Sequence, residues 1–168
     1  MNGKQRYEEF IKEHQSTLRM GTLIWTCLGV IGIFLIMKPI GIIVEIAAVM
    51  LGILNVKSWI KLNRTLDMVP DKQKFYQQME KPKATFLKFK IIVLEDYVLT
   101  NDSNVELFPL KTIEKIDVGV QKTGYKPKKC LFLTTTDGLQ HKIALVYENQ
   151  TVAALEEFDE IYQILNKK

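Results

Sequence analysis

The stretch MGTLIWTCLGVIGIFLIMKPIGIIVEIAAVMLGILNV, residues 20–56, decides how this chain is laid out. Its first 18 residues, 20–37, carry no charge. At a rise of about 1.5 Å per residue, a helix of that length spans about 27 Å, close to the roughly 30 Å of a bilayer's hydrocarbon core. After Lys38-Pro39, a second apolar run covers residues 40–56, with Glu45 as its one charged residue. Because proline breaks helices and restricts the residue before it, the two runs predict two helices joined by a tight turn.

We therefore expect a transmembrane hairpin over residues 18–60, with helices at about 20–37 and 40–60. A cleaved signal peptide is a poor alternative, because about 19 hydrophilic residues precede the first run and no small-residue cleavage site follows it. Two buried helices of a soluble protein are also a poor alternative, because the rest of a 168-residue chain is too small to cover both.

Lysine and arginine side chains set the expected orientation of the hairpin. They gather at the outer ends of both helices, namely Lys4, Arg6, Lys12 and Arg19 before the first, and Lys57, Lys61 and Arg64 after the second. The turn has only Lys38. The sequence thus predicts a two-pass protein of the cell membrane with both termini in the cytoplasm.

Small and polar residues form one stripe on each predicted helix, and such stripes mark helix contacts in lipid. The predicted helix-packing seam consists of Gly29, Gly32, Gly41, Glu45, Ala48, Gly52 and Asn55. Folding at the turn places Glu45 near Gly32, Ala48 near Gly29, and Asn55 near Thr22. Three roles remain open for Glu45: a neutral carboxyl that donates to a helix-one carbonyl or Thr26, a contact with another chain, or part of a proton or ion path.

The flanks of the hairpin are expected to be helical and basic. Residues 1–17 predict an amphipathic segment, with Tyr7, Phe10, Ile11 and His14 at helical spacing. It would lie on the inner membrane face or extend the first membrane helix. Residues 61–83 predict a basic juxtamembrane linker or helix, and the wider span 57–90 carries nine cations against three acids. A basic segment beside an apolar one favours a membrane surface over nucleic acid.

Residues 84–168 predict a small antiparallel β-domain closed by a helix. About six strands are expected, and Asp137-Gly138 between CLFLTTT and QHKIALV is the strongest hairpin signal. Residues 149–166 predict an amphipathic helix. The fold class is therefore α+β, with a two-helix transmembrane hairpin followed by a β-sandwich or barrel.

The strands KIIVLEDYVLT (90–100), ELFPLKTIEKIDV (106–118) and LFLTTTDGLQHKI (131–143), with the closing helix and the hairpin, resemble the bacterial pleckstrin-homology-like (bPH) membrane proteins. The step Pro109-Leu110-x-x-Ile113-x-x-Ile116 into a strand carries most of this resemblance. The resemblance implies a curved, roughly orthogonal β-sandwich capped by the helix, which serves as a binding or assembly module. It does not extend to phosphoinositide binding, because the lipid-headgroup signature of some eukaryotic relatives is not found in the first strand pair.

No motif of a catalytic, nucleotide-binding or metal-binding site is found in the sequence. The two histidines, His14 and His141, are expected to lie far apart. We therefore predict a protein that is not an enzyme and has no cofactor, small-molecule substrate or nucleic-acid partner. Possible anionic-lipid contacts are Lys57, Lys61, Arg64, Lys81, Lys83, Lys122, Lys126, Lys128 and Lys129.

The predicted function is a membrane-anchored module whose cytosolic domain binds a protein partner, or its own copies, at the inner membrane face. A different hypothesis is a self-immunity factor against a membrane-active peptide such as a bacteriocin, because small two-helix PH-like proteins also resemble such factors. An immunity factor would have a peptide gene beside its own, whereas a scaffold would co-purify with a membrane complex.

Overall fold

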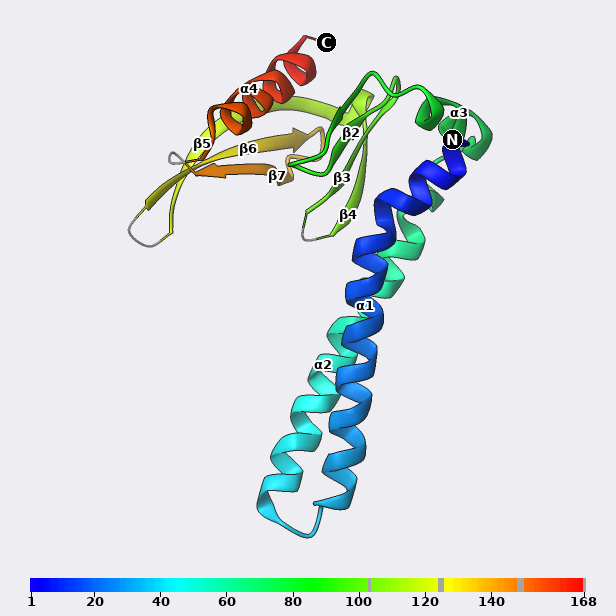
Figure 1. Cartoon of the computed structure of the whole chain (residues 1–168), viewed down its shortest axis with the longest axis vertical. Helices are drawn as coiled ribbons and strands as arrows, with labels where there is room; N and C mark the ends of the chain where they lie inside the picture. Colours follow the sequence, from blue (N-terminus) through cyan, green and yellow to red (C-terminus); the bar gives the residue numbers. More distant parts are fainter. Residues whose placement is uncertain (103, 124–125, 148–149, 168) are drawn as a thin grey trace.

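The computed structural model describes residues 1–102, 104–123, 126–147 and 150–167, and it has a long helical hairpin with a β-domain at one end (Figure 1). Helices α1 (Gly3–Phe34) and α2 (Pro39–Arg64) form the hairpin. An Asn2 capping box begins α1, and Pro39 occupies the first turn of α2, where its missing N–H costs no helical hydrogen bond. Both helices are long and apolar enough to cross a membrane.

The first helix is longer than the apolar pattern predicts, because it runs unbroken from Gly3 instead of beginning near residue 20. The N-terminal segment is therefore a continuation of the first apolar helix, which was one of its two interpretations. Tyr7 and Ile11 are 4% and 5% exposed, so this apolar stripe packs against protein instead of lying on lipid.

The β-domain contains two antiparallel sheets, which confirms the α+β class. The first has the order β1-β2-β3-β4 and the second β5-β6-β7. The strands are β1 (Ala84–Phe86), β2 (Ile91–Val93), β3 (Tyr97–Asn101), β4 (Val105–Pro109), β5 (Ile113–Thr123), β6 (Lys126–Thr135) and β7 (Gln140–Tyr147). The described residues thus form seven strands where six were expected, and β1 is the additional one. Between the hairpin and β1 lie η1 (Thr65–Met68) and α3 (Lys72–Glu80), while η2 (Leu110–Thr112) joins the two sheets and α4 (Val152–Asn166) ends the fold.

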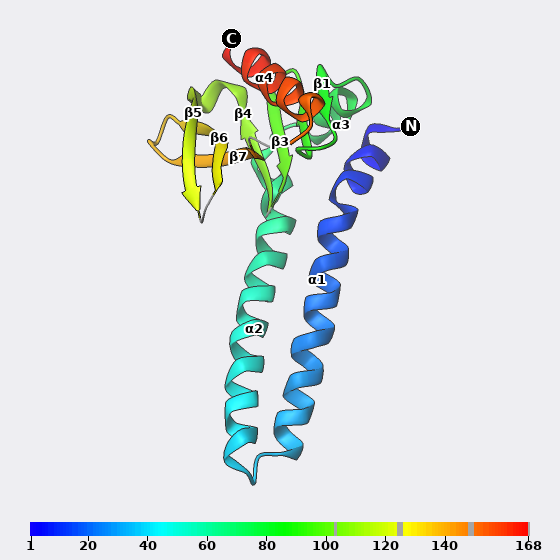
Figure 2. The same cartoon turned by 60° about the vertical axis from the view of Figure 1, so that its left-hand side comes forward.

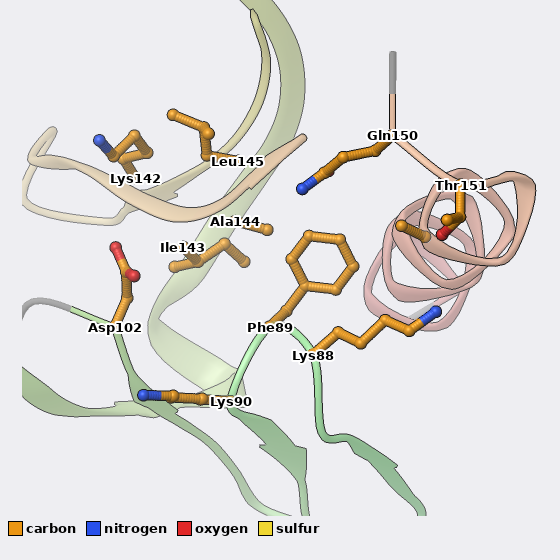
Figure 3. A pocket seen from close by; sticks show the side chains of 11 residues that line it. Lys88, Phe89, Lys90, Asp102, Lys142, Ile143, Ala144, Leu145, Gln150 and Thr151 are labelled. Atoms are coloured by element: carbon orange, nitrogen blue, oxygen red, sulfur yellow. The ribbon is translucent and has the colours of Figure 1, made fainter. Parts of the chain in front are cut away.

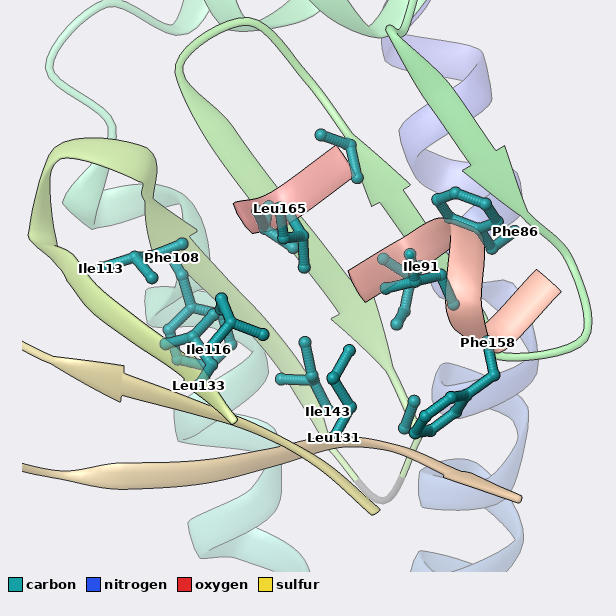
Figure 4. Close-up of a cluster of buried hydrophobic side chains, with 14 of the residues drawn as sticks. Phe86, Ile91, Phe108, Ile113, Ile116, Leu131, Leu133, Ile143, Phe158 and Leu165 are labelled. Carbon is teal, nitrogen blue, oxygen red and sulfur yellow. The ribbon is translucent and has the colours of Figure 1, made fainter. Parts of the chain in front are cut away.

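A first hydrophobic core lies between the two sheets and α4 (Figure 4). Ile91 and Phe108 enter it from the first sheet, Leu131 and Leu133 from the second, and Phe158 from α4. Helix α4 thus covers the space between the sheets, as an amphipathic closing helix should.

A second core lies on the other face of the first sheet, where the N-terminal end of α1 and the C-terminal end of α2 pack (Figure 2). In β2 and the residue after it, Ile91 and Val93 belong to the first core and Ile92 and Leu94 to the second. Side chains alternate between the faces of a strand, so this sheet is buried on both sides. The members of the second core are Tyr7, Ile11, Leu18, Leu62, Val69, Phe75, Met79, Ile92, Leu94, Leu99, Val105 and Leu107. The hairpin and the β-domain are therefore one packed unit.

Candidate juxtamembrane binding groove

Polar contacts fix both helices of the hairpin to the first sheet. The Asn101 side-chain amide donates to the Phe10 carbonyl at 2.6 Å, and Lys90 forms an ion pair with Glu13 at 2.7 Å. Directly after the end of α2, the hydroxyl of Thr65 in η1 is 3.4 Å from the Val105 carbonyl in a buried contact. These contacts fix the position of the hairpin relative to the first sheet.

Helix α3 is fixed to the turn between β2 and β3 by Asp96. The Lys74 ammonium lies 2.7 Å from the Asp96 carboxylate, and the Gln78 side-chain amide donates to the same oxygen at 2.7 Å. The hydrogen bond from Lys74, followed by that from Gln78, lowers the pKa of Asp96. The segment 61–83, predicted to be a basic juxtamembrane linker or helix, contains the end of α2, η1 and α3, and α3 packs on the first sheet.

A groove of about 930 Å³ lies where α2 leaves the predicted membrane boundary and meets the β-domain. One wall is α2, from which Lys57, Lys61 and Arg64 line the groove at positions i, i+4 and i+7 of one helix face. The opposite wall comes from β4 and the turn between β6 and β7, and it includes Glu106 and Leu139. We call this the juxtamembrane groove.

Some charged side chains of the juxtamembrane groove already have a partner within the protein, and others do not. Glu106 accepts from Lys61, and its other oxygen is 3.5 Å from Nδ1 of His141. Asp137 accepts from the Thr135 hydroxyl, and this bond, with a backbone bond at residue 139, lowers its pKa. Lys57 and Arg64, and the carboxylate of Asp67, have no ion-pair partner among the described residues. These two cations are thus free to meet an external anion.

The other lysines predicted to contact lipid do not join this groove. Lys83 lines a separate groove beside α4, and Lys81 ends α3. On β6, Lys128 lies over the Tyr147 ring at 4.7 Å, and Lys129 is exposed. The predicted contacts Lys122 and Lys126 fall outside the residues whose side chains the structure describes. Of the seven predicted contacts whose side chains the structure describes, Lys57, Lys61 and Arg64 line this groove.

Residues of the predicted helix-packing seam contact one another between the two helices of the hairpin. The Asn55 side chain accepts from the Thr22 hydroxyl at 2.8 Å and donates to the Leu18 carbonyl at 3.0 Å. Ala48 faces Gly29 at ordinary van der Waals distance. Gly52 lies under the Trp25 ring. Gly41 is packed against the turn at Leu35 and Ile36.

The hydrogen bond hypothesised for Glu45 is not formed. Its Oε2 packs against Gly32 and is buried without a partner. The Thr26 hydroxyl donates instead to the carbonyl of Thr22, one turn back on its own helix, at 2.7 Å. The carbonyl one turn back is always within hydrogen-bonding distance of a threonine in a helix. The hydroxyl of Thr26 therefore bonds to its own helix and not to Glu45 across the seam.

Sequence reasoning missed the cluster around Lys61. His141 is linked to this lysine through Glu106, and the charge of the lysine also acts on His14. Burial first, and then the charges of Lys61 and Lys90, lower the pKa of His14. No local motif could have revealed this cluster, because its members come from α1, α2, β4 and β7.

The described residues contain no group of three His, Cys, Asp or Glu side chains arranged to hold a metal ion. Comparison of the chain with models of protein families found no matching family, and comparisons with curated proteins and with solved structures found no significant match. The geometry of the hairpin, the two cores and the juxtamembrane groove is therefore the basis for a functional proposal.

Proposed function

We propose that this chain is a membrane-anchored binding module without enzymatic activity. Its hairpin crosses the cell membrane twice with both termini in the cytoplasm, and its PH-like β-domain binds a protein partner or another copy at the inner face. One observation carries this proposal: the second core, in which Tyr7, Leu62 and Phe75 pack on Leu99, joins the hairpin to the domain. Such a joint presents the domain surface at a constant height and angle above the bilayer.

The PH-like assignment rests on the order of elements. Two antiparallel sheets precede a single helix that covers the core between them, as the resemblance implies. The step Pro109–Ile116 contains η2 and enters β5, and Ile113 and Ile116 are both in the first core. These features support a PH-like domain, and its role as an assembly module is part of the proposal.

The proposal also includes binding of anionic lipid in the juxtamembrane groove. Lys57 and Arg64 lie on the cytoplasmic extension of α2, beside the exposed apolar side chains of Ile60 and Met68. Each cation near an anionic surface contributes about 1 kcal/mol of attraction. Because the helix is fixed to the sheet, lipid bound there would help to orient the whole domain.

The oligomeric state of the full chain in its native membrane tests the binding role. After extraction in mild detergent, size-exclusion chromatography with light scattering should give a particle of defined stoichiometry larger than the 19.4 kDa protomer. Mass spectrometry would then identify a second protein or a second copy. A chain that is monomeric and unaccompanied under conditions that preserve other membrane complexes would contradict the proposal.

Lipid contact has its own test with a matched control. The full chain in nanodiscs of phosphatidylglycerol and phosphatidylcholine would be analysed by native mass spectrometry. Lys57→Gln with Arg64→Gln should reduce retained phosphatidylglycerol severalfold, whereas Lys81→Gln with Lys83→Gln should leave it unchanged. Equal losses in both double variants would indicate diffuse attraction and no site in the groove.

A further inference from the structure

Strand β7 forms one edge of the second sheet and pairs only with β6. Within residues 140–146, no backbone group forms a hydrogen bond outside that pairing in the part of the chain that the structure describes. By contrast, the β4 edge of the other sheet is approached by Thr65 of η1, and β1 has three residues. An open edge strand offers a row of donors and acceptors to another extended chain.

A groove of about 760 Å³ runs along this edge (Figure 3). Four consecutive residues of β7, Lys142 to Leu145, line it. Ile143 and Ala144 both belong to the first core, so the alternation of side chains between the two faces is interrupted here, and the groove follows the strand along these four residues. The pairing with β6 skips Ile143, which makes a bulge there, and regular pairing resumes at Ala144.

Two other elements form the far side of the groove. Phe89, from the turn between β1 and β2, projects into its middle, and the N-terminal end of α4 contributes Thr151 and Ala154 (Figure 3). Ile143 and Ala144 are nearly fully buried at the floor, and the half-buried side chain of Phe89 supplies apolar surface beside them. An extended backbone on β7 would thus have an apolar position to fill.

The charges at the rim favour an acidic occupant. Lys142 is exposed and has no ion-pair partner among the described side chains, and Lys88 is 3.9 Å from Glu157, a loose contact. Lys90 is already paired with Glu13, and Asp102 opposes these cations at one end. Lys142 and Lys88 are therefore the two that remain available to carboxylates.

We propose that an extended segment of a partner protein, with acidic and apolar side chains in alternation, adds to the free edge of β7 as a fourth strand of the second sheet. Main-chain hydrogen bonds would supply affinity, and the apolar floor and Lys142 would select the side chains. The inference rests on the proposed binding role and names the chemistry of the partner.

The probe is a blocked seven-residue peptide of alternating valine and glutamate, titrated onto the full chain in nanodiscs of phosphatidylcholine. A matched control peptide has the same side chains but carries N-methyl groups on three alternate amides, which removes the donors of one edge. Since each hydrogen bond contributes about 0.5–1.5 kcal/mol, the control should bind about tenfold more weakly or worse. Amide exchange of residues 142–146 should slow when the unmethylated peptide is bound.

Charge variants of the protein complete the test. Lys142→Glu should weaken peptide binding about two- to fivefold, as for an exposed ion pair, whereas Lys111→Glu, an exposed lysine on η2, should not change it. Equal binding of the two peptides, or no binding of either, would overturn the proposal. If native membranes yield a defined complex while the peptide fails to bind, the edge is refuted and the binding role of the module stands.

Discussion

Replacing Phe75 by alanine should loosen the joint between the hairpin and the β-domain. Phe75 is 0% exposed and lies where α1, α3 and β3 meet. Its ring is edge-on to Tyr7 at 5.8 Å, to Tyr76 at 5.6 Å and to Tyr97 at 5.8 Å between centroids. Because it connects three elements, its removal tests the second core as a whole.

The expected loss follows from burial and ring geometry. Truncation of a buried phenylalanine to alanine costs about 3–5 kcal/mol, and each aromatic pair contributes about 0.5–1.5 kcal/mol beyond its buried area. With three such pairs we expect Phe75→Ala to cost about 4–5 kcal/mol, a large part of the total stability of a small domain. Leu87→Ala is the control, because Leu87 is 82% exposed and its truncation should change stability by about 0.5 kcal/mol or less.

Amide hydrogen exchange of the full chain in nanodiscs would measure this loss strand by strand. The sheet β1–β4 contributes to both cores, so the amides of β2 and β3 should lose protection in Phe75→Ala. They should also lose it in Phe158→Ala, which truncates a first-core residue that is 1% exposed. A change below about 1 kcal/mol in Phe75→Ala, or one confined to α3, would refute a shared, cooperative sheet.

Three further predictions concern the seam and the joint. Gly32→Ala should destabilise the hairpin by about 1–3 kcal/mol in a steric-trapping assay. A Cβ at this position would clash with the Glu45 side chain and would lie 3.2 Å from the Glu45 backbone nitrogen. Gly29→Ala should be tolerated, since the nearest atom to its Cβ across the seam is at 4.0 Å. Asn55→Ala removes two hydrogen bonds between α1 and α2 and should cost about 1–2 kcal/mol in the same assay. A neutral result would mean that the seam rests on small-residue packing alone. The pKa of His14 is lowered in the folded state, so its contribution to stability is present above its unfolded pKa of about 6.5 and is lost as pH falls through the folded value. The melting temperature should therefore fall between pH 7.5 and 5, and fall less in His14→Gln; identical slopes would exclude His14 as a cause.

The sequence predicts well where the pattern is local. Charge-free length defines the hairpin, and Lys38-Pro39 places its turn. Asp137-Gly138 marks the last β-hairpin, and Gly138 has a φ of +79°, a conformation that glycine adopts without strain. The closing helix follows from its apolar face, although it begins at Val152 instead of residue 149.

The sequence fails where contacts join distant segments. Strand β1 has three residues, too few for an alternating pattern to be recognised. The second core contains residues as distant in sequence as Tyr7 and Leu107, and no local period reports such an association. One signal was available: the run IIVL at 91–94 has no polar residue, which is typical of a strand buried on both faces. The hydrogen bond predicted for Glu45 was wrong for a different reason. Residue spacing gives the helix face on which a residue lies, but it does not give the residue's hydrogen-bond partner.

Burial of the first sheet on both faces has a consequence for how the module would select a partner. A flexible tether raises the local concentration of a domain at the membrane but leaves its orientation free. Here the second core holds the sheet against α1, α2 and α3, so in the proposed membrane arrangement the juxtamembrane groove and the β7 edge would keep constant heights above the bilayer. A partner segment anchored in the same membrane would have to present its extended stretch at the height of β7. The joint would thus discriminate between partners of equal sequence by the length of chain that separates the segment from its own membrane anchor.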